Sequence, residues 1–136
     1  MFLKRNKKGF TLIELLIVLV IIGLLASLVG PRLFGKIKKA KIKTAEAQIN
    51  LLGSALDEYF LDVGQYPTTE MGLNALIERP EGLENWDGPY LKKKVIPKDP
   101  WGKDYQYKCP GEHGDYDLFS YGPDGQPSSD DITSWK

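Results

Sequence analysis

The sequence predicts an α+β protein in which one long N-terminal helix packs on a small C-terminal antiparallel β-sheet. Three features of the sequence support this fold class. An apolar run covers residues 10–30, a helical repeat of apolar residues follows it, and two aromatic-rich runs lie near the C-terminus. At 136 residues, the chain has room for at most one modest soluble domain beside the apolar run.

The apolar run is long enough to cross a membrane. Between Phe10 and Gly30 only Thr11, Glu14 and Ser27 are polar. A helix of this length covers about 30 Å, the thickness of a bilayer core. Three interpretations are open: a secretory signal, a plain membrane anchor, and a segment cleaved just before its apolar run. The secretory signal is the least favoured, because the run is too long and a proline follows its only small-residue site.

Charges within and around this run need an explanation. A carboxylate such as Glu14 costs about 2.5–3.5 kcal/mol at the centre of a membrane helix. Basic residues flank the run on both sides, so the positive-inside rule gives no clean orientation. The basic residues without an intervening acid are Lys4, Arg5, Lys7 and Lys8 before the run and Arg32, Lys36, Lys38, Lys39, Lys41 and Lys43 after it.

The helix is expected to continue beyond Pro31, which removes one backbone hydrogen bond and either kinks or locally melts it. Apolar residues then recur at spacings of three and four, which predicts one face of an amphipathic helix ending near Gly64. The basic run GKIKKAKIK favours a solvated collar where the helix leaves the membrane. The alternative is that it binds anionic lipid or nucleic acid. The apolar face comprises Ala45, Ile49, Leu52, Leu56, Tyr59 and Val63.

The rest of the chain reads as short elements joined by loops. The stretch TTEMGLNALIERP predicts a short second helix, capped by Thr68 or Thr69 and ended by Pro80. Residues 81–104 are rich in glycine and proline and predict a loop. YQYKC (105–109) and YDLFSY (116–121), separated by PGEHGD, predict a β-hairpin.

The residues do not suggest an enzyme. His113 is the only histidine, and we expect it to be an ordinary turn residue without a catalytic partner. Asp115 and Asp117 could form an acid pair, but their segment reads better as sheet. The sequence has no phosphate-binding loop, dinucleotide fingerprint or CxxC motif. The single cysteine, Cys109, excludes an intramolecular disulfide within these residues.

An acidic loop near the C-terminus offers oxygen ligands. The stretch YGPDGQPSSDDITSW carries Asp124, Asp130 and Asp131 together with Ser128 and Ser129. Carboxylates and hydroxyls suit a hard cation such as Ca²⁺. Their spacing does not match the EF-hand template, so a solvated acidic loop is the alternative.

The stretch KKGFTLIELLIVLVIIGLLASLVGP resembles the leader and N-terminal helix of type IV pilins and their relatives. The resemblance implies that a prepilin peptidase cleaves after Gly9 and that Phe10 becomes the N-methylated N-terminus. The acid typical of the family falls on Glu14, and its helix-breaking proline falls on Pro31. In a filament, Glu14 could then pair with the N-terminal amine of a neighbouring subunit, which lowers the cost of burying it.

The second half of the chain resembles the major pseudopilins of type II secretion systems. GQYPTTEMGLNALIERP, GPYLKKKVIPKDPWGKDYQY and PGEHGDYDLFSYGPDG carry this resemblance. It implies a leader peptide (1–9), a hydrophobic transmembrane and filament-core helix (10–31) and a soluble periplasmic domain (32–136) with a calcium-binding loop (121–131). Alternatives are a type IV pilus major subunit, disfavoured by the single cysteine, and a membrane-tethered calcium-dependent binding domain.

The same resemblance implies a structural role without enzymatic activity. The subunit would span the inner membrane once, with its N-terminus cytoplasmic, and assemble into a periplasmic helical filament that drives export of folded proteins across the outer membrane. Implied partners are further copies of the chain, minor pseudopilins, the prepilin peptidase, an inner-membrane assembly platform and an outer-membrane secretin, but no nucleic acid.

The resemblance also implies a structural Ca²⁺ in the acidic loop. The loop is shorter than in many relatives and has serines where they carry a Gly/Glu run, which affects the serine ligands more than the aspartates. The implied ligands are the side chains of Asp124, Asp130 and Asp131, the carbonyl of Tyr121 and a group from Ser128 or Ser129.

Overall fold

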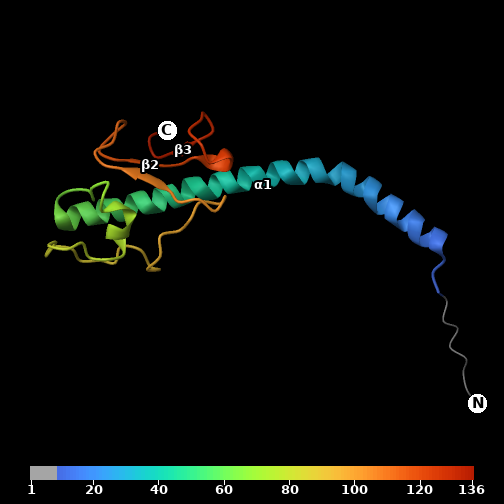
Figure 1. Ribbon diagram of the computed structural model, residues 1–136, viewed down its shortest axis with the longest axis horizontal. Helices are drawn as coiled ribbons and strands as arrows, with labels where there is room; N and C mark the ends of the chain where they lie inside the picture. The colour runs from blue at the N-terminus through green and yellow to red at the C-terminus, as the bar shows by residue number, and fades with distance from the viewer. Residues whose placement is uncertain (1–8) are drawn as a thin grey trace, which may run out of the picture. The chain divides into compact units, whose positions relative to one another are not determined.

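The computed structural model describes residues 9–136, so residues 1–8 of the expected leader peptide lie outside the described part. The chain divides into two compact units, Met1–Lys38 and Lys39–Lys136. Figure 1 shows the elements, which in chain order are α1 (Leu12–Val63), η1 (Gly72–Leu76), β1 (Gln106–Lys108), β2 (Asp117–Ser120), η2 (Gly122–Asp124) and β3 (Ile132–Thr133).

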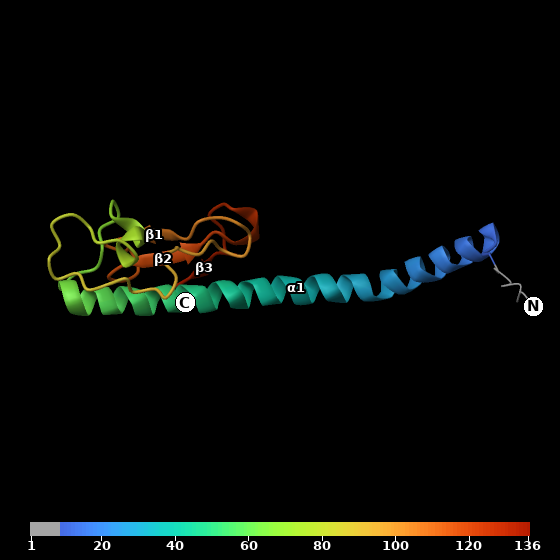
Figure 2. The same ribbon diagram turned by 90° about the horizontal axis from the view of Figure 1, so that it is seen from below.

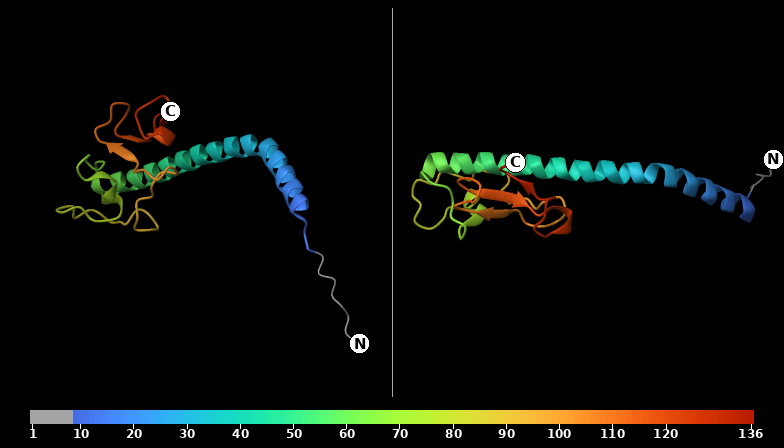
Figure 3. Two further views of the ribbon diagram at one scale, coloured as in Figure 1. Left: turned by 45° about the vertical axis from the view of Figure 1, so that its right-hand side comes forward. Right: turned by 90° about the horizontal axis from the view of Figure 1, so that it is seen from above.

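Helix α1 runs without a break through Pro31, as the continuous ribbon in Figure 3 shows. The missing N–H of Pro31 therefore does not melt the helix here. The helix ends at Val63, followed by Gly64 with a φ of 90°. The N–H of Gly64 donates to the carbonyl of Phe60 at 2.8 Å. A left-handed glycine of this kind commonly ends a helix, so the predicted end is confirmed.

The apolar stripe of α1 forms one side of the core in the second unit. Five of the six predicted residues are buried, Val63 is half-buried, and Ala55 joins them. The buried apolar residues are Ala45, Ile49, Leu52, Ala55, Leu56 and Tyr59 from α1, and Leu73, Ala75, Leu76, Trp86, Leu91, Tyr105, Leu118 and Ile132 from the segments that pack on it.

The sheet is antiparallel, with the strands in the order β1–β2–β3. Tyr107 pairs with Leu118 across β1 and β2, which confirms the predicted hairpin. Phe119 pairs with Thr133 in β3, a two-residue strand that the sequence did not indicate. Within the second unit the sheet lies along one side of α1 (Figure 2).

The predicted second helix is only a five-residue 3₁₀ helix, η1, which ends at Leu76 rather than at Pro80. The predicted threonine cap is absent: the N-cap residue of η1 is Met71, and no side chain among the described residues caps this helix. Thr68 instead closes the preceding turn, where its Oγ1 accepts the N–H of Met71 at 3.3 Å. Gly72 then takes a φ of 61°, which an α-helix cannot accommodate, so that turn does not extend into a longer helix. Residues 81–104 form the predicted loop, without helix or strand.

Candidate functional site

The first turn of α1 is closed by a reciprocal pair of hydrogen bonds. The N–H of Glu14 donates to Oγ1 of Thr11 at 3.2 Å, and the N–H of Thr11 donates to Oε2 of Glu14 at 3.4 Å. This is a capping box, in which each side chain satisfies a backbone donor that the helix leaves free. Glu14 therefore has a local role that we did not predict, although the spacing Thr-x-x-Glu signals it.

The peptide bond between Gly9 and Phe10 lies just before this capped turn. Both residues are exposed and precede the first helical residue, and the Phe10 side chain is 89% exposed. A Cβ atom added at Gly9 would meet no other atom within 4 Å. The chain is thus sterically open at the expected cleavage position.

The first half of α1 is apolar on all of its sides. Its Leu, Ile and Val side chains from Leu12 to Leu33 are all at least 50% exposed. By length and composition the helix could cross a membrane. Burying one such side chain stabilises by about 1.5–3 kcal/mol, so a segment of this kind favours a bilayer or the interior of an assembly over water.

A buried polar network holds the start of the acidic loop. Asp99, from the stretch PKDPWG, accepts the N–H groups of Trp101 (3.1 Å) and Lys103 (2.8 Å) through Oδ1. Its Oδ2 accepts the hydroxyl of Ser120 at 2.7 Å, and Oγ of Ser120 accepts the N–H of Gly122 at 3.1 Å. Because Asp99 is only 4% exposed, these partners offset the cost of burying its polar atoms.

The two ends of the acidic loop meet at Gly122. This glycine has a φ of 76°, and a Cβ atom there would lie 3.1 Å from the carbonyl oxygen of Asp130. The close approach brings the backbone next to Tyr121 beside the Asp130–Asp131 pair, although seven residues separate Gly122 from Asp130 in sequence. A side chain at position 122 would disrupt this closure.

Within the loop, the carboxylates bind nearby backbone groups. Oδ1 of Asp124 accepts the N–H of Gln126 at 3.1 Å, and Oδ1 of Asp131 accepts the N–H of Ser128 at 3.2 Å. Oγ of Ser128 accepts the N–H of Asp130 at 3.3 Å. Among residues 9–136, no three His, Cys, Asp or Glu side chains form a group that could hold a metal ion. The oxygen donors and the closed loop fit a hard cation, but the three aspartates do not converge.

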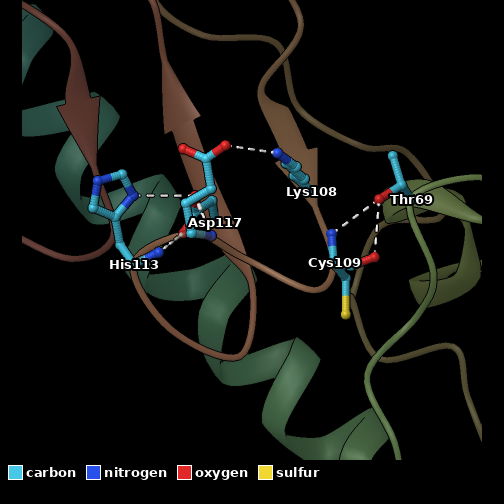
Figure 4. Close-up of polar contacts among 6 residues, drawn as sticks. Thr69, Lys108, Cys109, His113 and Asp117 are labelled. Carbon is cyan, nitrogen blue, oxygen red and sulfur yellow. Dashed lines mark hydrogen bonds and ion pairs between the residues drawn. The ribbon is translucent and has the colours of Figure 1, made fainter.

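Asp117 anchors the β1–β2 turn (Figure 4). It is 4% exposed and accepts the N–H of Glu112 at 3.0 Å and the N–H of His113 at 3.1 Å. Its Oδ2 also lies 3.1 Å from Nδ1 of His113. Burial alone would raise the pKa of Asp117, but these hydrogen bonds outweigh it and lower the pKa below its ordinary value. Exposed Asp115 takes no part, so the two aspartates do not form an acid pair.

His113 lies in the β1–β2 turn, as expected, and it also packs against the C-terminus. The ring of Trp135 stacks on it with centroids 4.0 Å apart, and Trp135 also meets Phe119 edge-on at 5.7 Å. The C-terminus is thereby fastened to the hairpin turn. Figure 4 also shows Thr69, whose Oγ1 donates to the carbonyl of Cys109 and accepts its N–H, both at 3.0 Å. These contacts position backbone and provide no catalytic arrangement.

Comparison with known proteins identifies the family. Residues 32–135 match the family model for type II secretion system (T2SS) protein G, and residues 4–30 match that for the prokaryotic N-terminal methylation motif.

Curated relatives include the type II secretion system core protein G of Escherichia coli K12, 50% identical over 134 residues, covering 96% of this chain and 92% of the relative. That of Dickeya chrysanthemi is 47% identical over 138 residues, covering 98% and 89%. The crystal structure of the major pseudopilin from the type 2 secretion system of enterohaemorrhagic E. coli superposes with a TM-score of 0.64 at 43% identity, covering 77% of this chain and 95% of that one. The chain therefore belongs to the type II secretion system protein G family, the major pseudopilins.

Proposed function

We propose that this chain is the major structural subunit of a type II secretion pseudopilus, a filament that drives export of folded proteins across the outer membrane. The observation that carries this proposal is that two family matches lie next to each other in the chain. The globular domain matches the protein G family, and the apolar helix before it matches the methylation motif. The family is structural, and the protein is not an enzyme.

The N-terminus would be processed before assembly. Cleavage after Gly9 by a prepilin peptidase leaves Phe10 as the N-terminal residue, which is then methylated. The exposed Gly9–Phe10 bond and the motif match over residues 4–30 support this step. The apolar helix would anchor the subunit in the inner membrane, with the N-terminus cytoplasmic and the folded domain periplasmic.

Glu14 would set the register of the filament. In an apolar filament core, an unpaired carboxylate is costly, whereas one that meets the N-terminal ammonium of a neighbouring Phe10 is much less so. The capping box supports this role, because it fixes Glu14 in the first turn of α1 and so gives its carboxylate a defined position for a neighbouring Phe10. Pro31 would mark the end of the filament-core segment.

Assembly requires further components. The self-assembling filament would meet minor pseudopilins, an inner-membrane assembly platform and an outer-membrane secretin, as expected for a major pseudopilin. No feature of the described residues argues for a nucleic-acid ligand.

The acidic loop would bind a structural Ca²⁺. Asp124, Asp130 and Asp131, the carbonyl of Tyr121 and an oxygen of Ser128 or Ser129 are the candidate ligands, and their chemistry suits a hard cation. The close approach of Gly122 to Asp130 supports the proposal, because it already brings the loop ends together. A bound ion would stabilise the folded domain by an amount that grows with the logarithm of the Ca²⁺ concentration once that concentration exceeds the Kd.

The direct test is assembly in cells that contain the matching secretion machinery. The filament fraction, collected after shearing and examined by electron microscopy, should contain this chain, and deleting the chain should stop export. A chain that stays monomeric in the membrane while export continues would refute the proposal.

A further inference from the structure

A shallow groove runs along one face of α1 where the apolar half of the helix ends. Its lining combines three aliphatic side chains, Leu28, Val29 and Leu33, with two cations, Arg32 and Lys36. The two cations are four residues apart and therefore lie one above the other on the same face. We call this surface the Arg32–Lys36 groove.

The position of the groove along the helix would place it at a membrane interface. From Leu12 to Arg32 the helix rises about 30 Å at roughly 1.5 Å per residue, which equals a hydrocarbon core of about 30 Å. With Leu12 at one face of the bilayer, Arg32 reaches the headgroups of the opposite leaflet. Leu28 and Val29 then lie beside the acyl chains, and Lys36 lies one turn farther out.

The charge of this region is unbalanced. No acidic residue occurs between Glu14 and Glu46, while six basic residues follow the apolar run. In the proposed topology these cations are translocated, against the usual preference for cations on the cytoplasmic side. An anionic partner at this interface would offset that charge.

We infer that the Arg32–Lys36 groove binds an anionic phospholipid of the outer leaflet, a step that rests on the proposed membrane-anchored function. Arg32 and Lys36 would contact the phosphate, because guanidinium and ammonium groups both pair with phosphate oxygens. One acyl chain would follow Leu28, Val29 and Leu33. The lipid would hold the subunit at a fixed depth until assembly extracts it.

The test measures lipid selectivity around the full chain. The purified protein is reconstituted in phosphatidylcholine bilayers with spin-labelled phosphatidylglycerol or spin-labelled phosphatidylcholine. The motionally restricted fraction gives the relative association constant. The wild type should prefer phosphatidylglycerol. In the Arg32→Gln/Lys36→Gln variant, the relative association constant for phosphatidylglycerol should fall at least fivefold, which corresponds to the loss of about 1 kcal/mol for one cation at a membrane surface.

The matched control is Lys38→Gln/Lys41→Gln, which removes the same charge. At about 100° per residue, Lys38 and Lys41 lie on the opposite face of the helix. This control should keep most of the preference. If both variants lose the same share of the preference for phosphatidylglycerol, the lipid responds to the overall surface charge, and the proposal that it binds in the Arg32–Lys36 groove is overturned.

An unchanged preference in the Arg32→Gln/Lys36→Gln variant, or no preference in the wild type, would also overturn it. The latter is the result expected if a second copy of the chain fills the groove. Failure of the proposed function would appear separately, as an uncleaved leader in protein from cells that contain the peptidase.

Discussion

The charge of Glu14 can be separated from its role in the capping box by the substitution Glu14→Gln. Glutamine has nearly the same shape, and its amide oxygen can still accept the N–H of Thr11, so the capping box is retained. The only large change is the loss of the negative charge. In the membrane this loss should be neutral or favourable, because a buried carboxylate is costly there.

In the filament the same change should be strongly unfavourable. It leaves the neighbouring subunit's ammonium without a partner in an apolar core, which costs about 3–5 kcal/mol. At about 1.4 kcal/mol per tenfold, this weakens each subunit contact by roughly two to three and a half orders of magnitude. We therefore expect normal amounts of processed subunit in the membrane but almost no filaments.

The assay compares the membrane and sheared-filament fractions of the wild type, Glu14→Gln and Glu14→Leu. Glu14→Leu removes both the charge and the capping bond, which costs the helix end about another 1 kcal/mol. If charge pairing is the assembly role, both variants fail to form filaments. If Glu14→Gln assembles normally while Glu14→Leu does not, the capping box is the essential feature and the pairing argument is refuted.

Three further predictions concern the folded domain, each measured by unfolding of the full chain in detergent. Leu52→Ala should lower the free energy of unfolding by about 2–5 kcal/mol because Leu52 is fully buried, whereas Leu51→Ala, at a 58% exposed neighbour, should change it by less than about 0.5 kcal/mol; similar effects would contradict the assigned helix face.

Asp117→Asn should cost about 1–3 kcal/mol at neutral pH. Because the pKa of Asp117 is lowered in the folded state, its contribution is full above about pH 4 and disappears as the pH falls through the folded value, so the variant should lose less stability on acidification; parallel pH profiles would count against this. Ca²⁺ at a hundredfold excess over its Kd should raise the free energy of unfolding by about 2.7 kcal/mol, or the Tm by roughly 10–20 °C. Alanine at the three aspartates of the acidic loop should abolish this gain. A wild-type Tm unaffected by Ca²⁺ or chelator would exclude the site.

The parts of the fold that depend on strong periodicity were predictable. The stripe from Ala45 to Tyr59 repeats often enough to specify which helix face is buried, and Gly64 follows the last helical residue. The hairpin had two aromatic runs and a turn rich in glycine. The matches that identify the family rest on these same long segments.

Short elements and long-range contacts were not predictable. Strand β3 has two residues, too few for an alternating pattern, and exists because Phe119 offers it a partner. The contacts of Asp117 with His113, and of His113 with Trp135, depend on how the turn and the C-terminus fold back. A single residue type in a turn carries no signal for such contacts.

Two local features could have been predicted from the sequence but were not: the capping box at the start of α1 and the break at Gly72. Thr11 and Glu14 have the spacing of a capping box, and the helix start at Leu12 follows from it. The positive φ of Gly72 separates η1 from the turn before it, and glycine at that position is a known signal for a break. The calcium ligands remain a prediction, because the three aspartates do not converge in the described residues.

The most direct test of the account is the intact mass of the protein extracted from membranes of cells that contain the matching prepilin peptidase. The account predicts a mass that lacks residues 1–9 and carries one added methyl group, so that Phe10 supplies the amine with which Glu14 pairs. A full-length mass, or cleavage beyond Ser27, would contradict it and return the apolar helix to the role of a plain anchor or a secretory signal.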